Sequence, residues 1–122
     1  MSTPSAEDNI LLVMRTGKWS MVVVAELRSG TRRFNELRRS MDGISQKTLS
    51  ATLRELERDG FISRTAFATI PPRVDYALTE LGTELLEIVD ICRDFAVRNR
   101  GAVASARAQF DRISGVALRS IG

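Results

Sequence analysis

No segment of this 122-residue chain constrains the fold more than ISQKTLSATLRELERDG, residues 44–60. Ser45 is suited to cap a helix there, because its hydroxyl can accept a hydrogen bond from a backbone N–H of the first turn. At 3.6 residues per turn, Leu49, Leu53 and Leu56 lie within about 60° of one another. The opposite side of this helix carries Lys47, Ala51, Arg54 and Arg58. The segment therefore predicts a helix over about residues 45–59 with one core face and one basic face.

Further helical segments precede this one. Residues 10–14 and 19–27 are apolar on almost every side, which predicts two helices buried between other elements. After a turn at Ser29-Gly30, apolar residues at Phe34, Leu37 and Met41 recur at i, i+3 and i+7, the spacing of a short amphipathic helix. A helix, a tight turn near residues 42–43 and a capped helix follow one another in the order of a helix-turn-helix.

Two strands are predicted after the basic helix. Residues 73–78 alternate, with Val74, Tyr76 and Leu78 on one side, as in a half-buried strand, and residues 61–67 form a second candidate. Between them lies Ala68-Thr69-Ile70-Pro71-Pro72, whose prolines hold the backbone extended and donate no ladder hydrogen bonds. We therefore predict a mainly α fold with a small β-hairpin (α+β), the winged helix-turn-helix, with flanking dimerisation helices.

The C-terminal third carries two apolar stripes. Thr79 can cap a long helix whose stripe consists of Leu81, Leu85, Ile88, Cys92 and Phe95. After an interruption at residues 99–101, a second stripe on a helical tail consists of Val103, Ala106, Phe110, Ile113 and Ala117. A core of four short helices and a hairpin is too small to cover both, which predicts a second subunit. The predicted dimer interface comprises Leu11, Leu85, Ile88, Cys92, Phe95 and Phe110.

Length and composition predict one soluble domain over residues 1–122. Its DNA-binding core is expected at about residues 18–78, with dimerisation helices at about 6–15 and 79–122. The longest apolar runs are five residues, against about 20 for a transmembrane helix, and the N-terminus lacks a secretory pattern, so a cytoplasmic protein without membrane contact is expected. With no His and a single Cys, we expect no metal, no cofactor and no disulfide.

The net charge of +3 is concentrated in one segment. Residues 31–64 hold eight basic and five acidic residues, whereas the other segments sum to zero. A local basic excess favours a polyanionic partner, although a solvated helix face with paired charges would have the same composition. Candidate contacts to base edges are Gln46, Lys47, Ser50 and Arg54, and candidate phosphate contacts are Arg58, Arg32, Arg33, Arg64 and Arg73.

Six short strings within residues 8–96 together carry a family resemblance. They are GKW at 17–19, RFNEL at 33–37, ISQK at 44–47 leading into Leu49 and LRELE at 53–57, DG at 59–60, PPRVDY at 71–76 and LTELG at 78–82. In this order and spacing they resemble the HxlR family of bacterial transcriptional regulators. The resemblance implies a winged helix-turn-helix homodimer, joined by the N-terminal helix and the long helix after the wing, that binds an operator with inverted half-sites. A small-molecule effector is compatible with it.

The sequence departs from the pattern of this family at one position. Several relatives sense electrophiles or oxidants through a cysteine near the N-terminus, and the corresponding position, about 11 residues ahead of Gly17, is Ala6. Thiol sensing by that route is therefore not expected. Cys92 lies in the apolar stripe, where a cysteine is expected to be buried as a small hydrophobe.

Taken together, the sequence predicts a transcriptional regulator that binds double-stranded DNA as a homodimer on an inverted repeat. The helix at about residues 45–59 would enter the major groove. The alternative is a winged-helix interaction module whose basic helix binds an acidic protein, and a steep salt dependence with protection of an inverted repeat would distinguish the two. An enzyme is not expected, because the chain has no evident pair of catalytic carboxylates, no Gly-rich phosphate loop and no nucleophile with a base.

Overall fold

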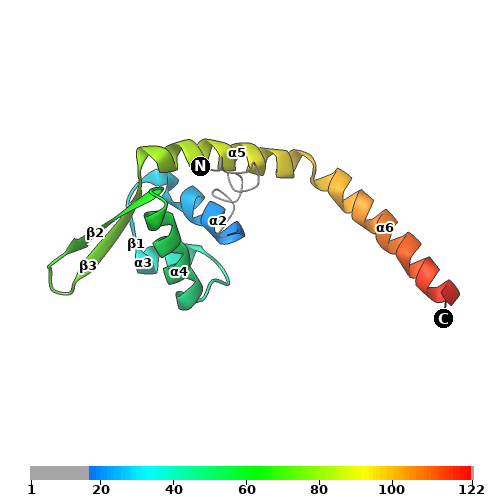
Figure 1. Cartoon of the computed structure of the whole chain (residues 1–122), viewed down its shortest axis with the longest axis horizontal. Helices are drawn as coiled ribbons and strands as arrows, with labels where there is room; N and C mark the ends of the chain where they lie inside the picture. Colours follow the sequence, from blue (N-terminus) through cyan, green and yellow to red (C-terminus); the bar gives the residue numbers. More distant parts are fainter. Residues whose placement is uncertain (1–16, 122) are drawn as a thin grey trace, which may run out of the picture. The chain divides into compact units, whose positions relative to one another are not determined.

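A computed structural model describes residues 17–121 of the chain (Figure 1). In chain order its elements are α2 (Lys18–Glu26), the 3-10 turn η1 (Leu27–Ser29), β1 (Arg32–Arg33), α3 (Phe34–Ser40), α4 (Gln46–Arg58), β2 (Ile62–Phe67), β3 (Arg73–Leu78), α5 (Glu80–Arg98) and α6 (Arg100–Ile121). This is the predicted order of helices and hairpin. The helix predicted at about residues 6–15, and Leu11 with it, lies outside the described residues.

The helix-turn-helix is formed by α3 and α4. The backbone N–H of Arg33 donates to Glu36 Oε1 at 3.1 Å, which satisfies a free donor where α3 begins. The turn between the helices includes Gly43, whose φ of 82° lies in the left-handed region that favours glycine. Ser45 then caps α4 as predicted, since its Oγ accepts from the Thr48 N–H at 3.1 Å.

The wing is the antiparallel pair β2 and β3, which runs from the Ile62↔Leu78 pair out to the Phe67↔Arg73 pair. Both predicted strands are confirmed as a hairpin, and a third strand that the sequence did not predict joins them. Arg32 and Arg33 form the edge strand β1 opposite Tyr76 and Asp75, so the sheet order is β1-β3-β2. A strand of two residues is too short to show any periodicity in the sequence. β1 is defined by its pairing with β3, which lies far away along the chain.

One core joins α2, the helix-turn-helix and the root of the wing. Val23 and Val24 of α2 are fully buried, and Leu37 of α3 and Leu49 of α4 are equally inaccessible. The core residues are Val23, Val24, Leu27, Leu37, Met41, Ile44, Leu49, Leu53, Leu56, Phe61, Ile62, Leu85 and Val89. The amphipathic patterns of α3 and α4 therefore predicted their buried faces correctly.

Hydrogen bonds and a close backbone contact connect the root of the wing to the start of α5. Thr79 Oγ1 donates to the Gly60 carbonyl at 2.6 Å and accepts from the Gly82 N–H at 3.0 Å, which caps α5 as predicted. Gly82 lies against the Phe61 carbonyl so closely that a Cβ at residue 82 would overlap that oxygen. Only glycine fits at this position.

The chain forms two compact units, residues 1–89 and residues 90–122, and the boundary falls within α5. The first unit contains the helix-turn-helix, the sheet and the start of α5. In the second unit, residues 91–98 and 100–113 are all exposed. Isolated helices without packing are marginally stable in water, so the exposed apolar faces of this unit favour burial against another surface.

Candidate nucleic-acid interface

The orientation of α4 is set by its three leucines. Leu49, Leu53 and Leu56 are buried in the core, so the opposite face of the helix points to solvent. The predicted base-contacting residues, Gln46, Lys47, Ser50 and Arg54, are all exposed on α4, as is Arg58. The helix therefore presents amide, hydroxyl, ammonium and guanidinium groups to solvent, which are the groups that hydrogen-bond bases and phosphates.

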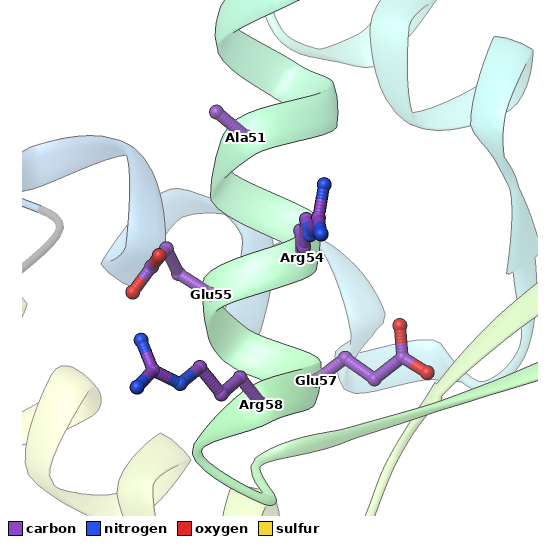
Figure 2. Close-up of a pocket in the computed structure, with 5 residues that line it drawn as sticks. All are labelled: Ala51, Arg54, Glu55, Glu57 and Arg58. Atoms are coloured by element: carbon purple, nitrogen blue, oxygen red, sulfur yellow. The ribbon is translucent and has the colours of Figure 1, made fainter.

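The arginines on the exposed face of α4 do not form ion pairs with the carboxylates of the same helix. Figure 2 shows Arg54 and Glu57 directed to one side of α4 and Glu55 and Arg58 to the other, with Ala51 beside the same shallow depression. Within residues 17–121, no ion pair joins Arg54 or Arg58 to a carboxylate. The structure therefore does not support the alternative of a solvated helix face with paired charges. Glu55 and Glu57 nevertheless give the depression both negative and positive side chains.

The basic residues before α4 lie in different settings. Arg32, in β1, pairs with Glu26 at 3.7 Å and is two-thirds covered. Arg33 is exposed at the start of α3. On α3 itself, Arg38 and Arg39 are exposed and line a shallow depression with Asn35.

The wing residues also differ from one another. Arg64 is exposed on β2, and the part of the chain that the structure describes offers it no ion pair. The Arg73 guanidinium lies 4.2 Å from the centre of the Phe67 ring and 3.3 Å from Asp75 Oδ1. These contacts neutralise and restrain Arg73, so of the two predicted wing cations only Arg64 has its charge unpaired.

A groove separates α3 from the wing tip. It is lined by Arg33, Phe34 and Asn35 on one side and by residues 69–74 on the other. Sequence reasoning did not predict this groove, because it arises from the pairing of β1 with β3, which brings the start of α3 beside the hairpin. Among the predicted site residues, the structure thus brings Arg33 and Arg73 to one groove and the α4 set to another surface.

The predicted dimer residues divide into two groups. Leu85 is only 5% exposed and belongs to the core, so in the single chain it offers little surface to a second subunit, and its place at an interface stays a prediction. Ile88, Phe95 and Phe110 are exposed to 49%, 58% and 69%. Cys92 is a free thiol that is exposed in the single chain, so its expected burial would require a second subunit. The apolar stripe of the sequence correctly predicted that α5 has an apolar face. It did not predict the position along α5 at which the core ends.

None of the helices between residues 17 and 121 combines the length and hydrophobicity that spanning a bilayer requires. In the same part of the chain, the potential metal-ligating side chains form no group of three or more.

The fold and the outward basic helix define a winged helix-turn-helix regulator. Residues 14–103 match the family model of the HxlR-like helix-turn-helix, and the chain belongs to this family. It is 40% identical over 92 residues to the HTH-type transcriptional regulator YtfH of Escherichia coli (strain K12), covering 75% of this chain and 73% of YtfH. It is 39% identical over 92 residues to the regulator YybR of Bacillus subtilis (strain 168), covering 75% and 74%.

Solved structures agree with this assignment. The transcriptional regulator ytfH from Salmonella typhimurium superposes with a TM-score of 0.74 at 36% identity, covering 84% of this chain and 91% of that one. The reduced form of the redox regulator HypR superposes with a TM-score of 0.75 at 38% identity, covering 83% and 99%. The chain is therefore a transcriptional regulator with a DNA-binding helix-turn-helix, and its relatives and fold indicate this role rather than an enzyme.

Proposed function

We propose that the protein binds an inverted-repeat operator as a homodimer, with α4 of each subunit in the major groove. The observation that carries the proposal is the exposed, unpaired basic face of α4, which the buried leucines turn outward. An α-helix, which is about 10–12 Å across with its side chains, fits the B-DNA major groove, which is about 12 Å wide. Lys47 and Arg54 can each bond guanine, and Gln46 can bond adenine with two hydrogen bonds.

Phosphate contacts would come from the arginines around α4. Arg58, in its last turn, and Arg33, at the start of α3, are exposed on the same unit. Arg64 on the wing adds a further exposed cation, for which residues 17–121 provide no ion pair. Such contacts position a protein on the duplex without reading its sequence, and each neutralised phosphate steepens the salt dependence of binding.

The second subunit is supported by the exposed apolar residues of α5 and α6. Ile88, Phe95 and Phe110 are each about half exposed or more in the single chain. Burial of such faces by a second copy would give a twofold-symmetric assembly, the commonest form of homo-oligomer. The two copies of α4 should then lie about 34 Å apart or at a multiple of that distance, the repeat of successive major-groove faces.

The test is to select binding sites from a random-sequence duplex library with the purified full-length chain and to map the protected bases. We expect an inverted repeat whose half-site centres are separated by about 10 bp or a multiple of it. Affinity for the recovered duplex should fall steeply with salt concentration. Recovery of no sequence above background would contradict the proposal. Binding instead to an acidic protein, with salt-insensitive and weak affinity for DNA, would favour the interaction-module alternative.

A further inference from the structure

The tip of the wing presents one apolar side chain and no charge. Residues 68–72 connect β2 to β3, and none of them is ionisable. Ile70, in the middle of this loop, is fully exposed at 102%. A single exposed hydrophobic residue is common on protein surfaces, so the exposure matters here only together with the way Ile70 is held.

The structure holds this tip in a fixed conformation. Thr69 Oγ1 donates to the Pro71 carbonyl at 2.9 Å, across the position of Ile70. The rings of Pro71 and Pro72 fix the backbone φ of two consecutive residues. At the base of the loop, the strand ladder extends to the Phe67↔Arg73 pair, and the Arg73 guanidinium stacks on Phe67. The backbone on both sides of Ile70 is therefore conformationally restrained.

The wing tip and the N-terminal end of α4 belong to the same compact unit. Within this unit, Figure 1 shows the hairpin and the start of α4 both reaching below the root of the sheet. The N-terminal part of α4 carries the residues that would contact bases, so the wing tip and the base-contacting end share one side. With α4 in the major groove, a projection on the same side of this unit would meet the adjacent minor groove, as the N-terminal arm of a homeodomain does.

The charge distribution indicates what kind of contact the tip can make. Arg73, the basic residue nearest to the loop, is paired with Asp75 at 3.3 Å. The tip itself therefore offers methyl and ring carbons rather than cations. Architectural DNA-binding proteins insert such side chains, Ile and Pro among them, between base steps in the minor groove, and the partial unstacking kinks the duplex.

We propose that Ile70 is an apolar wedge that enters the minor groove beside the operator half-site and bends the DNA. This inference rests on the proposed function, because it requires α4 to be in the major groove. It assigns to the wing tip a contact by shape and dispersion, distinct from the ionic contacts of Arg64. Sequence preference under the wing would then follow from how easily a base step unstacks, with pyrimidine–purine steps favoured.

The test measures DNA bending and affinity together. A duplex recovered by the library selection is labelled with a donor and an acceptor at its ends, and energy transfer and anisotropy are recorded with wild type, Ile70→Ala, Ile70→Leu and Ala66→Ser. We expect wild type to bend the duplex by about 20–90°. Ile70→Ala should lose most of the bend and bind about tenfold more weakly, since most of the inserted apolar surface is gone. Ile70→Leu should keep both, and Ala66→Ser, on the exposed surface of β2, should behave as wild type.

A salt titration separates the wedge from ionic contacts. The slope of log Kd against log salt should be unchanged in Ile70→Ala, whereas Arg64→Ala should reduce it by about one. Truncation of Ile70 should leave folding unchanged, because its side chain is fully exposed and lies outside the core.

Several outcomes would overturn the wedge. They are a straight duplex in the wild-type complex, wild-type bending by Ile70→Ala, or a loss of affinity in Ile70→Ala without a change of bend. Tight, sequence-specific binding of DNA in any of these cases would leave the proposed function intact. Failure of the wild-type chain to select any duplex would instead contradict the proposed function, and the wedge with it.

Discussion

At the scale of single residues, the proposed DNA-contacting face of α4 begins one residue away from the core. Leu53 is buried, and its neighbour Arg54 is exposed and without an ion pair in residues 17–121. Adjacent residues of a helix point about 100° apart, so a core residue and a DNA contact can follow one another in sequence. Arg54 can therefore be replaced without disturbing the core.

We predict that Arg54→Ala and Lys47→Ala each weaken binding to the selected operator by about 1–3 kcal/mol, the range for a bidentate base contact. Affinity for unrelated duplexes should change much less. Fluorescence anisotropy at fixed salt measures both. Arg58→Ala is the matched control, because loss of a phosphate contact should weaken all sequences alike. Wild-type affinity of both variants for the operator would argue against α4 as the reading helix.

Gly82 is a residue-scale determinant of the fold. A side chain at this position would overlap the Phe61 carbonyl, so the chain cannot accept one without moving the root of the wing. We predict that Gly82→Ala lowers the free energy of unfolding by about 1–3 kcal/mol, as overpacking does, measured by urea denaturation. Gly101→Ala, where a methyl group would meet nothing and helix propensity favours alanine, should leave stability unchanged or raise it by up to about 1 kcal/mol. Equal stability of the two variants would contradict this reading of the contact.

At the scale of elements, the start of α4 depends on its cap. Ser45 Oγ accepts from the Thr48 N–H at 3.1 Å and donates to Thr48 Oγ1 at 2.9 Å. Removal of the hydroxyl leaves a backbone donor of the first turn without its partner, which destabilises the helix end nearest to the proposed bases. The cap thus serves both stability and the placement of Gln46 and Lys47.

We predict that Ser45→Ala destabilises the protein by about 1 kcal/mol. Thermal or urea unfolding followed by circular dichroism measures the effect. Ser50→Ala is the control on the same helix, because Ser50 is exposed and makes no capping bond, and alanine there should stabilise the helix by a few tenths of a kcal/mol. A Ser45→Ala variant as stable as wild type would show that the hydroxyl is replaceable by water.

At the scale of the whole molecule, the exposed apolar residues of the second unit bear on assembly. Phe110 and Ile113 are 69% and 63% exposed, and they lie on one face of α6. With Val103 and Ala106 they follow the 3,4 spacing of a helix–helix seam. A surface of this kind, if covered by a second copy, would set the distance between the two α4 helices.

We predict that Phe110→Glu shifts the protein from dimer to monomer at micromolar concentration, because a charge would enter an apolar seam. Sedimentation velocity measures the shift. Operator affinity should fall with it, whereas the unfolding of the first unit should be unchanged. Ala108→Glu, about 200° away around α6, should remain dimeric. A wild-type chain that sediments only as a monomer would contradict the proposed homodimer.

The amino-acid sequence alone determined the elements and their faces. The leucine spacing of α4, the capping residues Ser45 and Thr79 and the alternation of residues 73–78 are local signals, and each predicted an element that the structure contains. The basic face of α4 followed from the same periodicity. Such signals act within a few residues, so they do not depend on the rest of the fold.

Tertiary structure alone decided what covers each face. Leu85 and Phe95 lie on one stripe, yet the first is in the core and the second is exposed, because packing of the first unit ends within α5. Pairing of β1 with β3 likewise brought Arg33 beside the wing, and Asp75 neutralised Arg73. Sequence periodicity shows that one face of a helix or strand is apolar or charged. The residues that pack against that face are distant in sequence, and only folding brings them into contact with it.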